Sequence, residues 1–457
     1  MKPFLLMSIA LTALAGVANA ADMPVKAMPK KAPPPVVYEW NGFYIGGYYG
    51  SAVGNQQGST PTTAPGSHLG VTNVNQMGAT LGLTLGYNWQ FDPHWFVGLE
   101  GDFGWMALNR SIVEYDDITN VGFRTDWYGT ARLRGGYVTG PSLLYLTAGG
   151  AFVHVRDEFG GNLSTVGSTY STFTTASWTA GAGIETKLSP NWSTKTEYLY
   201  IDGGSTHNFI ANPRGVAGVP SSFDHNFHVI KTGLNYRFGG SHDEGLLGWL
   251  TAPPMPSTHN WNGFYVGLNA GGGISNVNAT ATGTIGETQI NGTGFAGGGQ
   301  VGYNFMNILG PKWFAGVEGD FGALRIHAEM NDWFDQTSQF TDDTDWYATA
   351  RVRVGATTGP ALLYLTGGAA WVHTKVGFTP SAVTPIAQLT SRTGAGWTIG
   401  AGTEVALDAR WSARIESLYI DTGHSIALLA PPSAFGADFK DRFTVVRAGL
   451  NYQFGVP

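Results

Sequence analysis

The sequence lacks cysteine and is poor in charged residues. Asp, Glu, Lys and Arg make up only 12% of its 457 residues, against roughly a quarter in a typical soluble protein. The absence of cysteine excludes a fold that depends on disulfides. The formal net charge of -7 argues against a nucleic-acid partner, which would need a basic face. The surface must therefore be covered by something other than charge.

Long apolar runs are also missing after the first twenty residues. Lys2 and the apolar stretch 4–17 precede the small residues Ala18 and Ala20, which form the pattern of a secretory signal and its cleavage site. We therefore predict a signal peptide at residues 1–20. A permanent membrane anchor is the alternative, and it is disfavoured because the run is shorter than the ~20 residues of a spanning helix.

Glycine and aromatic residues are abundant instead. Glycine occurs 66 times and aromatic residues make up 13% of the chain, whereas glycine is roughly 7% of an average protein. No Gly-X-Y period is present, which excludes collagen, and the aromatic content argues against disorder. An exported, cysteine-free chain of this composition without spanning helices is typical of an outer-membrane β-barrel.

The chain contains one module written twice. WNGFYIGGYYG at 40–50 recurs as WNGFYVGLNAG at 261–271, and DWYGTARLRGGY from Asp126 recurs as DWYATARVRVGA from Asp345. The offset stays near 220 residues, which excludes a solenoid with its period of about 20 to 50 residues. A proline-rich segment, typical of an extended linker, precedes each copy. We predict a linker at 21–39, a first module at 40–238, a linker at 239–260 and a second module at 261–454.

Apolar residues alternate with small or polar ones along most of each module. In the segment that begins at Trp95, Val97 and Leu99 share one face, while Glu100 and Asp102 share the other. A period of two indicates a β-strand. The segment 143–154 is apolar on both faces, so its sides are not assigned. Eight strands are predicted in the first module, near 40–50, 78–89, 95–106, 126–138, 142–156, 172–188, 192–202 and 225–238.

The connections between these strands alternate in length. Short turns at FDP, TGP and SPN alternate with long stretches predicted as loops, at 51–77, 107–125, 157–171 and 203–224. Short periplasmic turns, long external loops and aromatic girdles are typical of outer-membrane barrels. Aromatic residues stand at predicted strand ends, namely Trp89, Trp95, Tyr137, Trp192, Tyr236 and Phe238. The predicted fold is all-β, a transmembrane antiparallel up-and-down β-barrel.

Charged residues within the strands share a face with glycine and threonine, and the opposite face is nearly free of charge. A soluble barrel of the lipocalin type would leave too few polar groups toward water, so we expect the charged face inside. An eight-stranded barrel has room only for its own side chains, and an unpaired buried charge costs several kcal/mol. We therefore predict a paired network that fills the interior, with proton or ion conduction through it as the alternative. The predicted interior residues are Glu100, Asp102, Arg132, Arg134, Glu185, Lys187, Lys195, Glu197, Lys231 and Arg237 in the first module, and Glu318, Asp320, Arg351, Arg353, Glu404, Arg414, Glu416 and Arg447 in the second.

The sequence contains no recognisable catalytic or cofactor motif. Neither Gly-x-Ser-x-Gly nor His-Glu-x-x-His occurs, and the glycine-rich stretch from Gly292 lacks the helix and the Lys-Ser/Thr pair of a phosphate loop. We predict no enzyme activity, no cofactor and no metal. Histidines in predicted loops or at strand mouths leave haem or metal capture as an alternative, and they are His68, His207, His225 and His424.

The motifs WNGFYIGG, DWYGTARLRGGY, LLYLTAGGAF, WTAGAGIE, TEYLYIDGG and GLNYRF occur in this order. Together they resemble the small outer-membrane β-barrel proteins of alphaproteobacteria, which include brucella surface antigens and rhizobial RopB-like proteins and are related to opacity proteins. The resemblance covers essentially the whole chain twice, whereas the relatives carry one module. It implies an eight-stranded barrel with exposed loops in the outer membrane of a Gram-negative bacterium.

The resemblance also implies partners. These are outer-membrane lipids, lipopolysaccharide and the assembly machinery, which reads aromatic residues of a terminal strand. Some members of the wider family are described as porins and some as haem binders. The residues predicted to carry the membrane-insertion signal here are Tyr236, Phe238, Tyr452 and Phe454.

Sixteen strands can form two eight-stranded barrels or one sixteen-stranded barrel, and only the second leaves an aqueous channel. The 22 residues between Phe238 and Trp261 exceed the other short connections, and the first module keeps its own terminal strand GLNYRF. Both features favour two tandem barrels. We predict a structural or surface-exposed outer-membrane protein whose long loops are its interaction surface, with a sixteen-stranded porin as the alternative.

Overall fold

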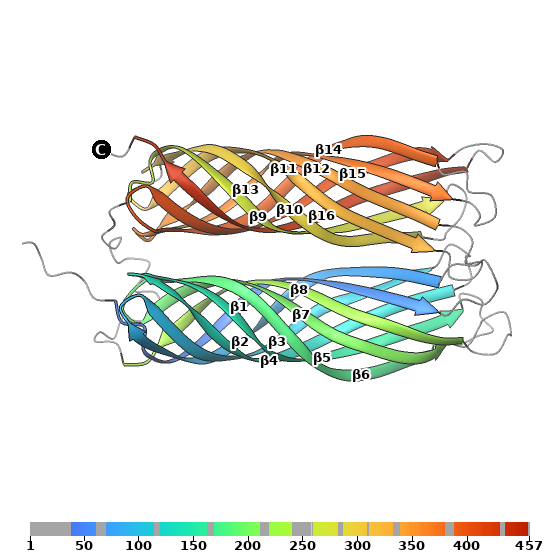
Figure 1. Ribbon diagram of the computed structural model, residues 1–457, viewed down its shortest axis with the longest axis horizontal. Coiled ribbons are helices and arrows are strands. Elements are labelled where there is room, and N and C mark those ends of the chain that lie inside the picture. The colour runs from blue at the N-terminus through green and yellow to red at the C-terminus, as the bar shows by residue number, and fades with distance from the viewer. Residues whose placement is uncertain are drawn as a thin grey trace, which may run out of the picture. The chain divides into compact units, whose positions relative to one another are not determined.

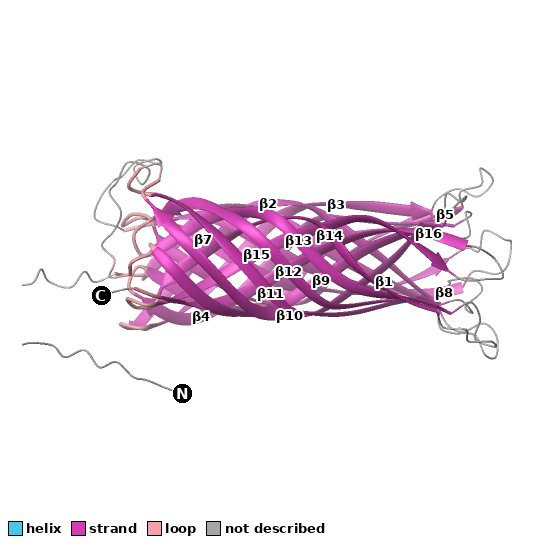
Figure 2. Cartoon of the chain, turned by 90° about the horizontal axis from the view of Figure 1, so that it is seen from above, coloured by secondary structure: helices cyan, strands magenta, loops and turns pink. Residues whose placement is uncertain are grey.

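The computed structural model describes residues 38–60, 70–113, 119–161, 169–210, 219–239, 257, 259–281, 287–308, 310–331, 339–379, 388–429 and 435–455. These residues form strands and short connections (Figures 1 and 2), and no helix among them is long and apolar enough to cross a membrane. The predicted signal peptide with Ala18 and Ala20, most of both linkers, and His68 lie outside the described residues.

The first module contains eight long strands. They are β1 (Gly42–Thr60), β2 (Gly70–Asp92), β3 (Trp95–Val113), β4 (Thr119–Thr139), β5 (Ser142–Gly161), β6 (Thr169–Lys187), β7 (Trp192–Ile210) and β8 (Val219–Arg237). Each is antiparallel to the next. The order is therefore the up-and-down arrangement that the alternation predicted.

The second module repeats these eight strands. They are β9 (Gly263–Ala281), β10 (Glu287–Met306), β11 (Trp313–Asn331), β12 (Gln339–Thr357), β13 (Ala361–Thr379), β14 (Gln388–Ala406), β15 (Trp411–Leu429) and β16 (Phe435–Gln453). In each module the short turns gather at one end of that module's strands (Figure 2).

Each module closes on itself. In the first, β1 pairs with both β2 and β8, and the N–H of Phe238 donates to the carbonyl of Phe43 at 3.0 Å. In the second, β9 pairs with both β10 and β16, and Phe454 donates to Phe264 at 2.9 Å. The chain therefore forms two eight-stranded barrels (Figure 1), and the alternative of one sixteen-stranded barrel is wrong. Closure pairs the two edge strands within each module, so neither needs a strand from the other.

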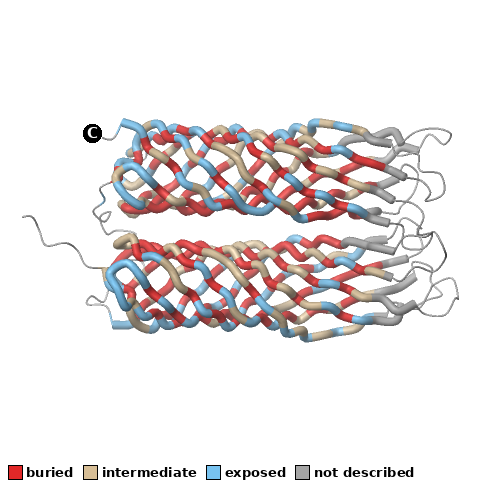
Figure 3. The backbone as a smooth tube through the Cα atoms, viewed as in Figure 1, coloured by how far each residue is buried: buried red, intermediate tan, exposed pale blue. Residues whose placement is uncertain are grey.

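Alternation places large apolar side chains outside and charged ones inside. Buried and exposed residues accordingly alternate along the strands (Figure 3). Leu81, Leu83 and Leu85 of β2 are each more than half exposed, whereas Thr84 between them is buried. The unassigned segment 143–154 obeys the same rule. Leu143, Tyr145 and Val153 point inward, while Leu146 and Phe152 point outward. Because both faces of β5 are apolar, only pairing with its neighbours fixes its sides.

The strands run well beyond the predicted boundaries at the end opposite the turns. Most of the stretch 51–77, predicted as a loop, belongs to β1 and β2, whose register continues to Thr60 and Gly70. The other three predicted loops are shortened in the same way. The predicted loop lengths were wrong because these extensions are rich in Asn, Gln, Ser and Thr and mostly lack outward apolar residues. Backbone pairing continues through them, and some of their inward residues, such as Val121 and Phe123, are apolar and buried.

The wall of each barrel is incompletely paired at two places. Pairing of β2 with β3 ends at Thr80 and Met106, and pairing of β10 with β11 ends at Gly294 and Ile326, although these strands continue. Pairing of β6 with β7 ends at Thr179 and Ile201, although both strands continue, and pairing of β14 with β15 ends at Trp397 and Asp421. At this level β7 and β15 each contain a bulge. The bulge uses a glycine with positive φ, 71° at Gly204 and 77° at Gly423. The bulge bends the strand away from its neighbour.

Candidate functional site inside the barrels

The candidate site of the first barrel is a cluster of buried charges in the half nearest the turns. Arg132 of β4 lies at its centre. Its guanidinium group donates to Glu100 at 2.6 Å, to Glu197 at 2.9 Å and also to Asp102. Lys231 of β8 approaches Asp102 and lies 3.0 Å from a Glu197 oxygen. Three carboxylates from two strands that are distant in sequence are thus joined by two cations.

A second layer of this cluster lies one step closer to the turns. Arg134 pairs with Glu185 at 2.8 Å and with Glu100 at 3.0 Å, and Lys195 also pairs with Glu100, at 2.8 Å. The hydroxyl of Tyr44 donates to Glu100 at 2.6 Å. The side chains of these charged residues are almost completely inaccessible to solvent.

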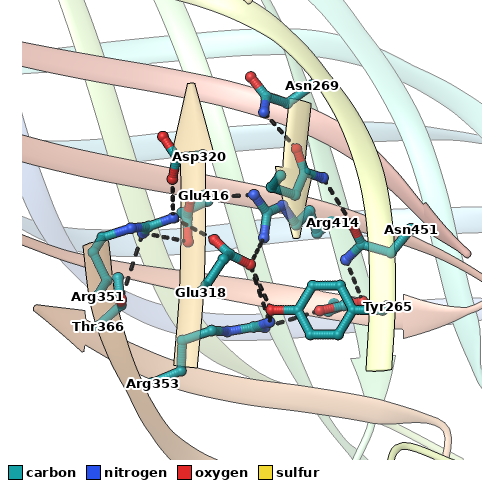
Figure 4. Close-up of polar contacts among 12 residues, drawn as sticks. Tyr265, Asn269, Glu318, Asp320, Arg351, Arg353, Thr366, Arg414, Glu416 and Asn451 are labelled. Carbon is teal, nitrogen blue, oxygen red and sulfur yellow. Dashed lines mark hydrogen bonds and ion pairs between the residues drawn. The ribbon is translucent and has the colours of Figure 1, made fainter. Parts of the chain in front are cut away.

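The second barrel rebuilds the centre of this cluster (Figure 4). Arg351 contacts Glu318, donates to Asp320 at 2.7 Å, and donates to Glu416 at 3.0 Å. Arg447 takes the place of Lys231 and donates to Glu416 at 2.6 Å and to Asp320 at 3.0 Å. The arginine reaches the same two carboxylates with more donors than the lysine has.

The layer nearest the turns recurs as well. Arg353 pairs with Glu404 at 2.9 Å and with Glu318 at 3.3 Å, and Arg414 pairs with Glu318 at 2.6 Å. The hydroxyl of Tyr265 donates to Glu318 at 2.6 Å. Figure 4 shows the side chains of Arg353, Arg414 and Tyr265 converging on Glu318 from several strands.

Inward glycines make room for the tyrosines of these clusters. A Cβ on Gly86 would lie 2.3 Å from the ring of Tyr44, and one on Gly302 would lie 2.3 Å from the hydroxyl of Tyr265. No side chain fits at that separation, so the abundant glycine has a packing reason here.

Opposite charges in each cluster compensate for burial. Moving one ion into a low-dielectric interior costs several kcal/mol unless a partner and hydrogen bonds replace water. Among the predicted interior residues, each module contributes four carboxylates to its cluster. They are Glu100, Asp102, Glu185 and Glu197 in the first barrel, and Glu318, Asp320, Glu404 and Glu416 in the second. Four cations face them in each case, namely Arg132, Arg134, Lys195 and Lys231, and Arg351, Arg353, Arg414 and Arg447.

Two predicted members lie apart from the first cluster. Lys187 donates to the carbonyl of Pro190 at 3.3 Å and forms no ion pair with a described carboxylate. Arg237 lies 3.9 Å from Glu185 and donates to the carbonyl of Trp40. Both cations approach the ring of Trp40, at 5.2 Å and 5.1 Å from its centroid.

Trp40 itself closes the turn end of the first barrel. It precedes β1, is fully buried, and its indole N–H donates to the carbonyl of Gly140 at 3.1 Å. Trp261 does the same in the second barrel, donating to Gly359 at 2.7 Å. The strand predicted near 40–50 begins at Gly42, slightly later than expected, because the Trp40 side chain folds across the barrel mouth and does not continue the alternation.

An apolar layer lies next to the charged layer, on the side away from the turns. Leu108, Val153, Ile201 and Phe227 belong to one buried cluster of the first barrel. Leu324, Val372, Ile420 and Phe443 belong to the matching cluster of the second. Beyond this apolar layer the interior again contains ionisable groups, with His225 3.6 Å from Asp157 in the first barrel and Arg392 2.6 Å from Asp441 in the second. Each described interior thus has a charged layer next to the turns and an apolar layer above it.

The predicted histidine candidates are not brought together. His225 points into the first barrel, with its Nε2 3.6 Å from Asp157, whereas His207 is exposed and His424 is exposed in the second barrel beside Asp438. All three belong to strands, not loops. Among the described residues, one group of three acids has the spacing of a metal site, Glu100, Asp102 and Glu197. Arg132 and Lys231 already occupy their oxygens.

A protein-family model, "Outer membrane protein beta-barrel domain", matches residues 7–238 and 245–454. The chain belongs to this family. Among curated relatives, the 31 kDa outer-membrane immunogenic protein of Brucella melitensis biotype 1 is 35% identical over 253 residues, which are 52% of this chain and all of that protein. The 22 kDa outer membrane protein of Rhizobium leguminosarum bv. viciae is 29% identical over 177 residues, 38% of this chain and 69% of that protein.

Solved structures are more distant. The Ail protein of Yersinia pestis matches at 15% identity with a TM-score of 0.21, over 42% of this chain and 99% of that chain. Neisserial surface protein A matches at 15% identity with a TM-score of 0.24, over 42% and 98%. Likenesses this weak say nothing about what the chain binds. The family and its Brucella and Rhizobium members place this β-barrel protein in the outer membrane of a Gram-negative bacterium.

The sequence reasoning missed a pair of histidines that this family member carries at matching positions. His154 stacks on Trp127 at 5.4 Å, and His373 stacks on Trp346 at 5.6 Å. The signal was available, since GGAFVH and GGAAWVH end the longest matching segment of the two copies. Both rings lie on the outer face, where an aromatic girdle meets the headgroups.

The residues predicted to carry the insertion signal lie at the turn end. Tyr236 packs on Trp192 at 5.1 Å and on Phe238 at 5.4 Å. Tyr452 repeats both contacts, with Trp411 at 5.2 Å and Phe454 at 5.1 Å. Each closing strand thus carries an outward aromatic cluster at the barrel rim.

Proposed function

We propose that the protein is a structural component of the outer membrane in which both barrels are filled and neither conducts solutes. The observation that carries this proposal is the paired charge cluster of each barrel, in which four carboxylates face four cations. Arg237 is a further cation near Glu185 in the first barrel, and Trp40 or Trp261 lies across the mouth. Paired side chains that hold one another leave no continuous water path. A catalytic role has no support, because the buried carboxylates are engaged by arginine and lysine.

The proposed orientation has the turns in the periplasm and the strand extensions outside the cell. The extensions and the connections beyond them are then the surface that meets the environment. Tyr236, Phe238, Tyr452 and Phe454 act in this proposal as signals for the assembly machinery. Phe238 and Phe454, each about half exposed, are available to such a partner before insertion.

Single-channel recording in a planar lipid bilayer tests the filled interior. The folded full chain is expected to produce no steady conductance above the lipid baseline. The double variant Arg132→Ala/Arg351→Ala serves as the positive control. It removes the central side chain of both clusters and is therefore expected to conduct. Steady channels from the unmodified protein would overturn the proposal.

A further inference from the structure

The outer face of the first barrel carries two arginines in direct opposition. Arg124 of β4 and Arg156 of β5 are cross-strand partners. Both side chains point away from the interior, Arg124 exposed and Arg156 half-buried. Directly opposed residues have Cβ atoms about 5 Å apart, so like charges there destabilise the sheet unless an anion lies between them.

Both arginines keep N–H groups that no described residue accepts. Asp126 accepts the Nε–H of Arg124 at 2.6 Å, and among the described residues no acceptor takes the terminal amino groups of Arg124. Arg156 stacks over the ring of Tyr170 at 4.1 Å and forms no ion pair with a described carboxylate. Glu158 follows on the same face, one step farther from the turns.

The height of this pair matches the headgroup region of the membrane. On β4 the outward aromatic residues Tyr137 and Trp127 mark the two girdles. They are about ten residues apart, which at about 3.4 Å per residue and a tilt of about 40° spans about 26 Å. That is the thickness of the apolar band of an outer-membrane barrel, about 25 Å. Arg124 and Arg156 lie just beyond Trp127 on the side away from the turns.

The second barrel does not repeat the pair. At the same register it has Asp343 opposite Lys375, a combination that needs no external anion. Asp345 there already binds Lys375 at 2.7 Å and Arg325 at 3.1 Å. In the second barrel Asp345 binds both cations of this face, whereas in the first Asp126 binds Arg124 alone, and Arg156 has no carboxylate partner among the described residues.

We propose that Arg124 and Arg156 bind the phosphorylated headgroup of lipopolysaccharide on the outer wall of the first barrel. Guanidinium groups bind phosphate oxygens in a bidentate manner, and two of them at one register position match a phosphate on a sugar headgroup. The stacked pair of Trp127 and His154 next to the site supports the sugar ring. This inference rests on the proposed orientation, because only then does the site face the lipopolysaccharide leaflet.

Native mass spectrometry of the full chain in phosphatidylcholine nanodiscs tests the site with bisphosphorylated lipid A as the probe. The unmodified protein is expected to retain lipid A. Arg124→Gln and Arg156→Gln are each expected to weaken retention by about five- to tenfold. Arg124→Lys, which keeps the charge and loses the bidentate geometry, is expected to give an intermediate loss.

Matched controls remove one cation elsewhere. Lys375→Gln at the same register of the second barrel and Arg410→Gln in a turn are expected to leave retention within about twofold. Lipid A stripped of its phosphates is expected to bind the unmodified protein no better than bisphosphorylated lipid A binds Arg124→Gln. Inorganic phosphate is expected not to displace the lipid. Equal losses in the controls, equal binding of dephosphorylated lipid A, or displacement by inorganic phosphate would each refute the proposal.

Folding is checked for every variant by the shift in gel mobility on heating. Binding in nanodiscs does not depend on the orientation of the barrel in cells, so the two proposals fail separately. Labelling of a single cysteine at Ser205, in the extension of β7, by a membrane-impermeant maleimide on intact cells tests orientation alone.

Discussion

The two barrels use the same carboxylates with different cations. Lys195 and Lys231 of the first barrel correspond to Arg414 and Arg447 of the second, yet each cluster keeps four anions and four cations. At the turn end the difference is larger, because Lys187 and Arg237 have become Ala406 and Gln453. Trp261 keeps its place without either cation, held by its hydrogen bond to Gly359. The comparison teaches that burial requires each charge in the cluster to have a partner of opposite charge. The tryptophan at the mouth, in contrast, does not require a cation beside it.

The largest effect is expected from removing the central arginine. Arg132→Met leaves Glu100, Asp102 and Glu197 with too few partners, and Arg351→Met does the same in the second barrel. Losing one partner of a buried ion pair costs about 3 to 5 kcal/mol, so we expect each variant to lower the free energy of unfolding by that amount. Urea unfolding in lipid vesicles measures it. If only one of the two variants lost stability, the two charge clusters would not be equivalent.

A smaller effect is expected from exchanging the cations that differ. Arg447→Lys loses the hydrogen bond to Tyr347 at 2.7 Å and part of its contact with Glu416. The expected cost is about 1 to 3 kcal/mol, the range for a hydrogen bond to a charged group. Lys231→Arg keeps both carboxylate partners and should cost less. The same unfolding assay compares the two variants. A larger loss for Lys231→Arg than for Arg447→Lys would contradict the stabilising role given to the additional hydrogen bonds of Arg447.

Adding a methyl group beneath the inward tyrosines is expected to be costly in both barrels. Gly86→Ala forces Tyr44 away from Glu100, and Gly302→Ala forces Tyr265 away from Glu318. Overpacking of this kind costs about 1 to 3 kcal/mol. As a control, Gly150→Ala tests an exposed glycine of β5, where the nearest atom lies 3.9 Å from the added carbon, an ordinary van der Waals distance. Unchanged unfolding of both interior variants would contradict the packing role.

The smallest effect concerns one turn and depends on pH. In the second barrel the N–H groups of Trp411 and Arg410 donate to Asp408 at 2.7 Å, which holds the pKa of this carboxyl below its usual value. In the first barrel the neutral Ser189 accepts from Trp192 at 3.2 Å. A lowered pKa means that the stabilisation is present above the unfolded pKa of about 3.9 and disappears as the pH falls through the folded value.

We therefore expect Asp408→Asn to lower the free energy of unfolding by less than about 1 kcal/mol near neutral pH, because the group is exposed. In strong acid the difference from the unmodified protein should vanish. Ser189→Ala should show no such pH dependence. Unfolding curves measured near neutral pH and in strong acid test this expectation. If Asp408→Asn still differed from the unmodified protein in acid, the charged hydrogen bond would not be the cause of the difference.

Sequence alone predicted the faces of the strands but not their partners. Alternation along one strand is enough to put Glu100 and Arg132 inside, because it depends on a period of two. It cannot show that Arg132 meets Glu197, 65 positions away, because that contact depends on the curvature and register of the whole barrel. Trp40 was misplaced for a related reason, since its apolar character suited a strand as well as a plug.

The extensions of the strands were missed for a different physical reason. Between 51 and 60 the chain has no apolar face, because the residues there need not meet lipid. The pairing that continues through Gln56 and its neighbours is a property of the backbone, which leaves no signature in side-chain polarity. Arg124 and Arg156 escaped notice likewise, because only the register of β4 and β5 brings them together.

The separate closure of each barrel is tested most directly by engineered disulfides, since the chain has no native cysteine. Ile45 and Tyr236 are outward-facing partners on β1 and β8, and paired strand positions lie within the Cα separation of a disulfide. In oxidised full chain, mass spectrometry should find the cross-link in Ile45→Cys/Tyr236→Cys and none in Ile45→Cys/Tyr452→Cys. A cross-link only in the second pair would mean that β1 closes against β16 in one wide barrel.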